Sequence, residues 1–505
     1  MFQSSSMWRN MPTWQYQLSY LNKEQFQIKC IKTPLPINLK KRMPWSAYES
    51  TLEQLLRTKK QVQEIPKHVM RAIHYQPKKQ LTDFSAKGIA ALSRACPFWD
   101  KLYDHQKSGV AKVVIEFRGS ALIADEMGAG KSYTALASAC IILSKQKHAR
   151  MLVLCPAFLV KQWQRYAAEY LATIDVQCFS YDKAKNIHKE LKKEKWHLIL
   201  CDESHCLKDT KTKRFKKLGA LIRKAKFKLL LSGTPCVNKA NELFSPLNLL
   251  YPKVFKAYKK YCFRYYDILA RRCRLPEELN IMLPMFGLIR REKAEVLDLP
   301  KKQIHWWYIV DMEARKSVAK LKKRLEAEDT KDSNMAKYLI GEAFHELAAL
   351  KTQCQQYKDL LKTLILKRER PVVMFCVHLS ILEMLNTLCE EMQLRYDTIS
   401  GAVAMKKRDG IVSRFQAGEI DVLCCTIASA GVGLTLTKSS HVVIAESDWV
   451  PGNLNQAIDR VHRIGQANEV HVDRVVFSDS LDEWILKVEK GKKKMHKLLL
   501  ARKKK

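Results

Sequence analysis

The sequence predicts an α/β protein with two parallel-sheet blocks, a helical insertion between them and a small N-terminal accessory region. Two observations predict this architecture. From about residue 95 onward, short apolar runs alternate with longer amphipathic stretches, and this series is interrupted once by a charged, helical stretch. Short buried runs separated by helical segments are typical of parallel sheets built from β-α-β units. The 505 residues are also enough for two to four domains.

The expected strands are eight apolar runs, four in each block. They are residues 121–124, 151–155, 197–201, 228–231, 371–377, 421–425, 441–445 and 470–477. Between them, residues 313–367 contain no proline and a single glycine, Gly341, which favours helix. The expected division of the chain is an accessory region at 1–90, a first block at 95–296, a linker strand and helical spacer at 297–345, a second block at 346–480 and a basic tail at 481–505.

The net positive charge of the chain favours a polyanion as its partner. Lys and Arg total 89 against 51 Asp and Glu, a net charge of +38, and nucleic acid is the usual polyanion for such an excess. Residues 207–228 carry ten basic residues and one acidic residue, as do residues 484–505. A generally basic composition or a solvated lysine face would give similar counts, so charge alone leaves both interpretations open.

Other classes of protein are not indicated. No apolar run approaches the roughly 18–20 residues of a membrane helix, and the opening residues lack the layout of a secretory signal. The 15 cysteines include no C-x-x-C pair and lie mostly inside apolar runs. We therefore expect an intracellular, reducing environment and no zinc site.

The strongest local signal follows the first apolar run. A phosphate chain needs backbone N–H groups close to it, and glycines allow that approach at the start of a helix. In such a loop the lysine reaches the β- and γ-phosphates and the serine hydroxyl binds magnesium. An ordinary strand–turn–helix is the alternative, because an acid stands where the general pattern has its first glycine. The candidate loop is Asp125, Glu126, Met127, Gly128, Ala129, Gly130, Lys131 and Ser132.

Two adjacent acids, Asp202 and Glu203, follow the apolar run 197–201. Magnesium-assisted hydrolysis needs one carboxylate for the metal and a second to polarise the attacking water. Acids at the carboxyl end of a strand beside a phosphate loop supply both. A pair of acids in a surface turn is common, so this interpretation depends on the companion motifs.

Three further pieces fit the same chemistry. Gln106 is a candidate for the adenine edge, and Ser232 opens a Ser-Gly-Thr-Pro turn after the run 228–231. Arg460 and Arg463 are expected on one helical face, from which they could neutralise charge on a γ-phosphate. Each piece alone is as well explained by a surface residue, a turn or a basic helix. Their order along the chain is what favours a nucleotide-hydrolysing site.

These motifs also resemble a known family. The run DEMGAGKS, then DESH, SGTP and QAIDRVHRIGQ, is similar to the motifs of Swi/Snf-type ATPases of helicase superfamily 2, and the chain looks closest to the HARP-like annealing helicase branch. Supporting pieces are CPAFLVKQWQRY, LIRREKAEVL and TIASAGVGLTL. The resemblance covers about residues 95–480, with a fainter match to a HARP domain at residues 42–56. The sequence departs from the family pattern at Trp449-Val450-Pro451, where the family usually has Trp-Asn-Pro.

The resemblance implies two RecA-like lobes with ATP between them. It assigns ATP to Gln106 and the loop 125–132, magnesium to Ser132 and Asp202, and the catalytic water to Glu203. It further implies catalytic roles for Lys131, Arg460 and Arg463. Contacts with duplex DNA fall on Lys208, Thr210, Thr426 and Trp449.

The expected function is that of an ATP-dependent translocase on double-stranded DNA that remodels or reanneals structures such as forks. Double-stranded or forked DNA is the expected partner, with no membrane and with protein partners unknown, and the motor is expected to be monomeric and nuclear, or nucleoid in a cell without a nucleus. A nucleosome remodeller, an RNA helicase and an ATP-gated DNA clamp with little turnover are the alternatives. The missing histone-reading modules argue against the first, and HRIGQ with Arg460 against the second. Intact Lys131, Glu203 and Arg463 argue against the third.

Overall fold

The computed structural model describes residues 16–21, 25–30, 40–58, 62–75, 78, 81–236, 239–267, 272–327, 333–430 and 434–500. These residues form two compact units, each described here by itself. One consists mainly of residues up to 290, and the other of residues 291–493 together with the short segment 126–129. No helix in the described part of the chain is both long and apolar enough to cross a membrane.

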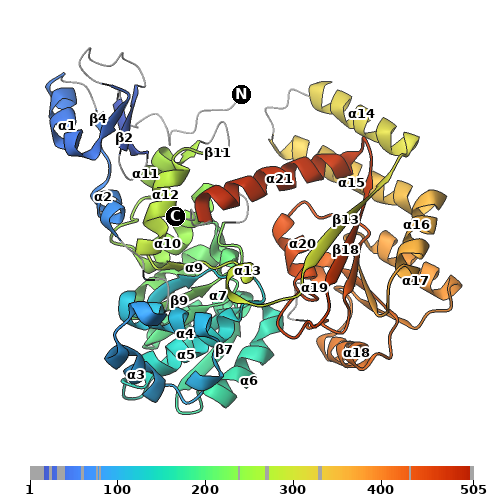
Figure 1. The fold of residues 1–505 in the computed structure, drawn as a ribbon, viewed down its shortest axis with the longest axis horizontal. Coiled ribbons are helices and arrows are strands. Elements are labelled where there is room, and N and C mark those ends of the chain that lie inside the picture. The colour runs from blue at the N-terminus through green and yellow to red at the C-terminus, as the bar shows by residue number, and fades with distance from the viewer. Residues whose placement is uncertain are drawn as a thin grey trace. The chain divides into compact units, whose positions relative to one another are not determined.

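The first unit is built around a six-stranded parallel sheet (Figure 1). Its strand order is β12-β5-β9-β8-β6-β7. The strands are β5 (Ser120–Ile123), β6 (Arg150–Cys155), β7 (Asp175–Ser180), β8 (Leu198–Cys201), β9 (Phe227–Leu231) and β12 (Leu288–Ile289). The helices are α3 (Ala86–Arg94), α4 (Asp104–Ala111), α5 (Lys131–Leu143), α6 (Val160–Tyr170), α7 (Tyr181–Asn186), α8 (His188–Lys193), α9 (Lys213–Lys224), α10 (Phe244–Leu250), α11 (Tyr258–Tyr265) and α12 (Pro276–Met285).

Apolar cores lie on both faces of this sheet. Successive side chains of a strand point to opposite faces, and on β6 Leu152 and Leu154 join one core whereas Met151 and Val153 join the other. All four side chains are inaccessible to solvent. This two-sided burial explains why the inner strands are continuous apolar runs in the sequence.

The second unit contains another six-stranded sheet, which is also parallel. Its order is β13-β18-β17-β14-β16-β15. The strands are β13 (Lys302–Ile309), β14 (Val372–Cys376), β15 (Tyr396–Ile399), β16 (Val422–Thr426), β17 (His441–Ile444) and β18 (Val470–Phe477). The helices after residue 291 are α13 (Lys293–Val296), α14 (Met312–Ala327), α15 (Ser333–Gln353), α16 (Gln355–Leu366), α17 (Leu379–Glu391), α18 (Met405–Ala417), α19 (Ile427–Ala430), α20 (Pro451–Ile458) and α21 (Leu481–Leu500).

The predicted fold class, two parallel α/β sheets, is confirmed. The eight apolar runs are the strands β5, β6, β8, β9, β14, β16, β17 and β18. The helical stretch after residue 312 packs against the second sheet, because Leu321, Leu339 and Phe344 join the same core as Val372 and Met374.

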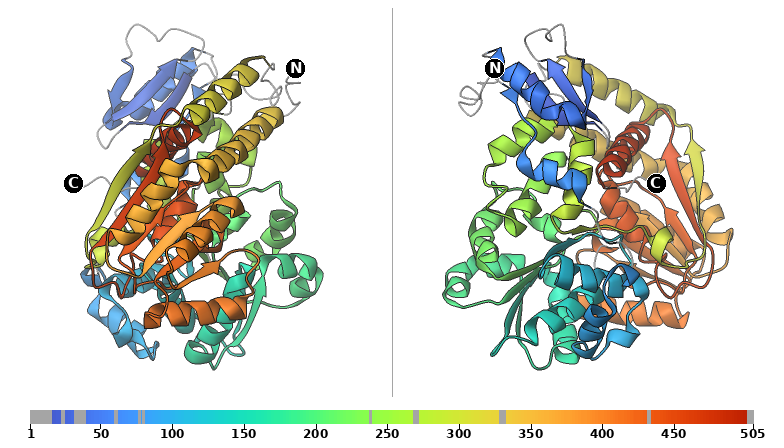
Figure 2. Two further views of the ribbon diagram at one scale, coloured as in Figure 1. Left: turned by 90° about the vertical axis from the view of Figure 1, so that its right-hand side faces the viewer. Right: turned by 60° about the vertical axis from the view of Figure 1, so that its left-hand side comes forward.

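The N-terminal region forms a small mixed sheet of its own, in the order β3-β2-β1-β4. Its elements are β1 (Tyr16–Tyr20), β2 (Gln25–Cys30), β3 (Arg42–Pro44), β4 (Val62–Gln63), α1 (Tyr48–Arg57) and α2 (Lys67–His74). Figure 2 shows this sheet, in blue, beside the green helices α11 and α12. There the buried guanidinium of Arg264 bonds to both carboxylate oxygens of Glu278 and to the carbonyls of Leu18 and Glu64. The buried Arg264–Glu278 ion pair thus connects the accessory region with helices α11 and α12 of the same unit.

Candidate functional site

The loop after β5 has the backbone that the sequence predicts for phosphate binding. Gly128 and Gly130 have φ values of +85° and +77°, in the left-handed region that favours glycine. A Cβ atom on Gly130 would stand 2.2 Å from Nε2 of Gln106, so a side chain there would displace that amide. Lys131 then begins α5, with Ser132 as the second residue of that helix. The loop leaves room for backbone groups to approach a ligand and aims the start of a helix at it.

Lys131 lies among carboxylates in the first unit. Its Nζ atom donates to the carbonyl oxygen of Asp125 at 3.0 Å. Burial lowers the pKa of Lys131, and the charges of Glu203, Asp125 and Asp202 act in the opposite direction. The structure therefore brings the lysine and the acid pair together, although they are about seventy residues apart in the sequence.

The acid pair follows β8. Asp202 Oδ2 accepts a hydrogen bond from Nε1 of Trp163 at 2.9 Å, and Oδ1 accepts from the backbone N–H of Glu203 at 2.8 Å. Burial, followed by the charge of Glu203, raises the pKa of Asp202 to about 6. Glu203 has a φ of 47°, a left-handed conformation that is uncommon for a residue with a Cβ atom. Strained backbone of this kind is concentrated at functional sites.

His205 connects the acid pair with the Ser-Gly-Thr-Pro turn. Its Nδ1 atom lies 3.1 Å from Oε2 of Glu203 and 3.3 Å from Oγ of Ser232. Arg290 joins the same turn to the strand before the glycine loop, because its Nη1 atom donates to the carbonyls of Ala124 and Gly233 at 2.6 and 2.9 Å. The carboxyl ends of β5, β9 and β8, which are neighbours in the sheet, thus carry one connected set of groups.

Gln106 is buried in α4 beside this loop. Its Oε1 atom accepts from the backbone N–H of Tyr103 at 3.0 Å, and its Nε2 atom donates to the carbonyl of Gly130 at 3.4 Å. The amide is therefore oriented by the protein at both ends. Its assignment to an adenine edge stays a prediction.

The two candidate arginines lie in the second unit, and their expected placement on a helical face is wrong. Helix α20 ends at Ile458, and Arg460 and Arg463 lie in the turns that follow it. Hydrogen bonds to residues outside the helix hold this segment, including the bond from Arg463 Nη1 to the carbonyl of Leu434 at 3.1 Å. Residues 126–129 belong to the same unit, where a Cβ atom on Gly128 would stand 3.4 Å from Cβ of Arg463.

The residues expected to contact duplex DNA have different environments. Lys208 is partly exposed and forms an ion pair with Glu242 at 3.6 Å, and Thr210 is also partly exposed. Thr426 ends β16, is 5% exposed and donates to Ser429 at 2.7 Å. Trp449 packs edge-on against Phe344 and Trp484.

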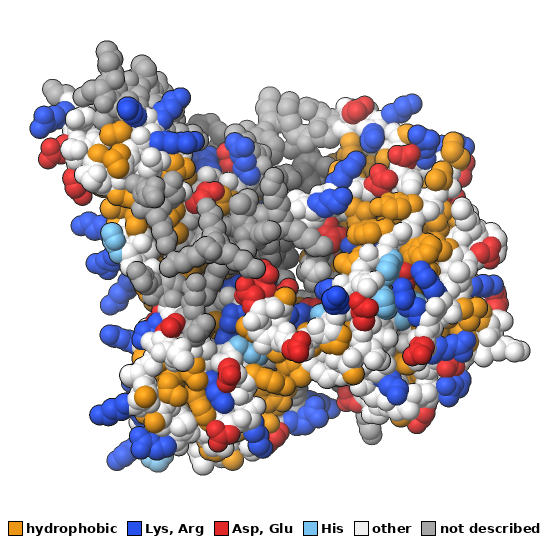
Figure 3. Space-filling view, in the orientation of Figure 1, with side chains coloured by type: hydrophobic (Ala, Val, Ile, Leu, Met, Phe, Trp, Pro, Cys, Tyr) orange, Lys and Arg blue, Asp and Glu red, His pale blue; other side chains and the backbone are white. Residues whose placement is uncertain are grey.

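Exposed lysines are numerous around this part of the first unit. Helix α9 buries Phe215, Leu218 and Leu221, which leaves Lys213 and Lys216 exposed. On the face shown in Figure 3, Lys and Arg side chains are scattered over the surface rather than gathered in one patch. Surface charge by itself therefore does not locate a path for a nucleic acid.

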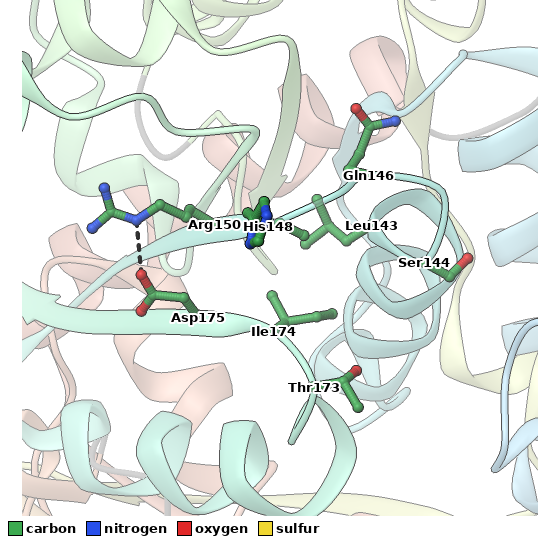
Figure 4. A pocket seen from close by; sticks show the side chains of 9 residues that line it. Leu143, Ser144, Gln146, His148, Arg150, Thr173, Ile174 and Asp175 are labelled. Carbon is green, nitrogen blue, oxygen red and sulfur yellow. Dashed lines mark hydrogen bonds and ion pairs between the residues drawn. The ribbon is translucent and has the colours of Figure 1, made fainter.

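A hollow in the first unit lies away from the candidate site. It has a volume of about 580 Å³ and is lined by residues that include Leu143, His148, Arg150 and Asp175 (Figure 4). Arg150 and Asp175 begin β6 and β7, whereas the glycine loop and the acid pair follow the other ends of their strands. Figure 4 shows Arg150 bonded to Asp175 across two neighbouring strands.

Two residues that shape this site, Trp163 and Arg290, received no role from the sequence. They lie in the runs CPAFLVKQWQRY and LIRREKAEVL, which carry the family resemblance. Those runs were a signal that the segments matter, but a local pattern does not tell which distant group each side chain meets.

Comparison with known proteins gives the chain a family. A model of the SNF2-related domain matches residues 105–186 and 166–360, just over half of the chain, and a model of the helicase conserved C-terminal domain matches residues 355–465.

Among curated relatives, the SWI/SNF-related matrix-associated actin-dependent regulator of chromatin subfamily A-like protein 1 homolog of Caenorhabditis elegans is 29% identical over 463 residues. That alignment covers 86% of this chain and 66% of the relative. The human DNA annealing helicase and endonuclease ZRANB3 is 28% identical over 423 residues, covering 76% of this chain and 39% of the relative. The chain thus spans less than two thirds of the length of these curated relatives. Among solved structures, the Sulfolobus solfataricus SWI2/SNF2 ATPase core in complex with dsDNA matches 82% of this chain and 92% of that chain, at 20% identity and a TM-score of 0.39.

Proposed function

The chain belongs to the SNF2-related domain family, and on that premise we propose that it is a DNA-dependent ATPase that moves along double-stranded DNA. One observation carries the proposal. At the carboxyl ends of neighbouring strands, the structure joins a glycine loop, a lysine and an acid pair, which is the arrangement that phosphoryl transfer to water requires.

Each side chain has a proposed role in hydrolysis. Residues 125–132 bind the phosphates, with Lys131 placing its ammonium against them, and Gln106 faces the base. Glu203 orients and polarises the attacking water, and Arg460 and Arg463 neutralise charge that develops on the γ-phosphate. Closing the site around the nucleotide excludes bulk water and completes this set of groups.

The residues present fit a magnesium ion. The pKa of Asp202 is raised by burial and by a neighbouring carboxylate, so a cation would stabilise its ionised form. Ser132 and Asp202 are the proposed ligands. A magnesium ion bound there would offset charge on the phosphate oxygens.

DNA as the substrate is supported by charge and by relatives. The net charge of +38 and the exposed lysines of α9 suit a phosphate backbone, which gives affinity without base specificity. Lys208, Thr210, Thr426 and Trp449 are the proposed contacts. The human relative is named a DNA annealing helicase, which supports rewinding or remodelling of forked DNA as the outcome of translocation. The C. elegans relative is named a regulator of chromatin, which supports a nuclear site of action.

We extend the proposal to the organisation of the chain. Residues 95–296 and 346–480 are proposed as the two lobes of a monomeric motor, with residues 297–345 between them. Residues 1–90 are proposed as an accessory region and residues 481–505 as a basic tail.

The first test measures ATP hydrolysis at fixed, moderate salt in separate reactions. One reaction contains no nucleic acid, and the others contain single-stranded DNA, plain duplex DNA, forked duplex DNA or RNA. We expect strong stimulation by duplex and more by forks. The Lys131→Ala variant supplies the background rate, because it removes the group placed against the phosphates. Stimulation by RNA alone, or by no nucleic acid, would overturn the proposal.

A further inference from the structure

Lys293 is a buried lysine for which the motifs provide no role. It begins α13 and is 5% exposed. Its Nζ atom lies 2.5 Å from Oδ1 of Asp459 and donates to the carbonyl oxygen of His462 at 2.9 Å. Asp459 and His462 are each 8% exposed, so water screens these contacts little. All three residues belong to the second unit.

The two acceptors alternate with the candidate arginines along the chain. Asp459 directly precedes Arg460, and His462 directly precedes Arg463. Asp459 is also the C-cap of α20, where the helix dipole favours a positive charge. The ammonium of Lys293 therefore fixes two points of the short segment that carries both arginines.

The backbone of Lys293 contacts the glycine loop at the same time. Its N–H group donates to Oε2 of Glu126 at 2.8 Å, and Glu126 in turn donates its own N–H to the carbonyl of Arg291 at 3.0 Å. A Cβ atom on Gly128 would stand 3.4 Å from Cβ of Arg463 and 3.5 Å from Cδ of Lys293. Within the second unit, Lys293 thus lies against the loop segment 126–129 and the arginine segment together.

Stability alone is a poor reason for this arrangement. Replacing a buried ion pair with apolar side chains of similar volume is often neutral or stabilising, because both charges lose their hydration. The ionic contact instead restricts the geometry of the residues that it joins. A short charge-assisted bond and a second bond to a main-chain carbonyl hold residues 459–462 in one geometry, which an apolar contact would not.

We propose that, in the ATP hydrolysis proposed above, on which this role depends, Lys293 is a positioning residue for the arginines. It acts through Asp459 and the carbonyl of His462 and holds Arg460 and Arg463 against the glycine loop. Small displacements of charged groups at a reaction centre cost large factors in rate. Lys293 therefore controls turnover rather than nucleotide affinity.

The test compares Lys293→Met in the full-length protein with wild type, Arg463→Ala and the double variant, in duplex-stimulated hydrolysis. We expect Lys293→Met to lower kcat roughly 10- to 100-fold, as for a misplaced catalytic group, with KM for ATP within about threefold. Because Lys293 acts on Arg463 and Arg460 together, Lys293→Met should slow the Arg463→Ala variant by a smaller factor than it slows wild type. The Lys293→Arg variant should recover part of the loss.

Lys351 offers a matched control in the same unit. It forms an ion pair with Asp482 that is 2.8 Å long and still more deeply buried than the pair of Lys293 with Asp459. Lys351→Met should lower thermal stability but leave kcat per folded molecule within about twofold of wild type. If Lys293→Met does not fold, Asp459→Asn tests the same contact with both side chains still present.

Two results would overturn the role of Lys293 without affecting the proposed function. One is a kcat for Lys293→Met within twofold of wild type, and the other is losses that multiply in the double variant. A wild-type protein that does not hydrolyse ATP would instead contradict the proposed function itself.

Discussion

Two carboxylates follow buried strands at corresponding edges of the two sheets, and their pKa values are shifted in opposite directions. Asp202 follows β8, and burial together with the charge of Glu203 raises its pKa to about 6. Glu446 follows β17 in the second unit. Burial raises its pKa too, but the hydrogen bond from His378 and the charge of Lys351 outweigh burial, so its pKa lies below the ordinary value.

The partners of the two groups explain the difference. Glu446 Oε2 accepts from the backbone N–H groups of Val377 and His378 at 2.9 Å each, and Oε1 lies 2.6 Å from the His378 ring. The protein itself compensates this charge. Asp202 is followed directly in the chain by a second carboxylate, that of Glu203. A bound cation would therefore stabilise the ionised form of Asp202. A carboxylate just after a buried strand is therefore structural in one sheet and, as we propose, catalytic in the other.

The largest effect is expected at the first sheet, where Glu203→Gln keeps the shape of the side chain and removes its charge. Turnover should fall by roughly 10²- to 10⁴-fold, the usual contribution of a general base. ATP binding and the melting temperature should change little. Steady-state hydrolysis, nucleotide titration and thermal melting measure the three quantities. Turnover within a few-fold of wild type would place the catalytic carboxylate elsewhere, or make the protein an ATP-gated clamp.

The reverse pattern is expected for Glu446→Gln in the second sheet. An amide cannot accept from three donors as a carboxylate does, so the free energy of unfolding should fall by about 1–3 kcal/mol. Hydrolysis per folded molecule should stay within about twofold of wild type. Chemical denaturation and active-fraction-corrected rates separate the two effects. A large loss of turnover with unchanged stability would contradict the contrast between the sheets.

A smaller effect is expected for His205→Ala, which removes the link between Glu203 and Ser232. Losing one orienting contact is worth about 1 kcal/mol, or roughly fivefold in turnover. The rate should drop without a change in KM for ATP. If the His205→Ala rate matches that of Glu203→Gln, the histidine takes part in the chemistry rather than orienting the carboxylate.

The apolar runs of the sequence predict the inner strands of both sheets, and of the terminal strands only β13 lies in a range, 297–345, where a strand was expected. The eight apolar runs are the four central strands of each sheet, whereas β12, β7, β13 and β15 occupy the four terminal positions. Strands β7, β13 and β15 are less completely covered and carry partly exposed side chains, whereas β12 is buried but is only two residues long. On β13, Trp306 is 39% and Tyr308 57% exposed. A search for continuous apolar runs cannot find such strands.

Some residues of the candidate site could be predicted from the sequence and others could not. Lys131, Asp202 and Glu203 are recognisable because their chemistry lies in contiguous motifs. Trp163 and Lys293 are not, since each acts through a partner that the sequence does not connect to it. The helix expected under Arg460 and Arg463 was wrong for the same reason, because contacts from distant residues shape that segment after α20 ends.

The left-handed backbone of Glu203 has an evolutionary consequence. A glycine adopts a φ of 47° freely, whereas a residue with a Cβ atom gives up about 1–2 kcal/mol there. Selection for a sturdier fold would therefore drive position 203 toward glycine, and that same step would remove the carboxylate. By having glutamate there, this chain gives up that stability for the carboxylate to which we assign the attacking water.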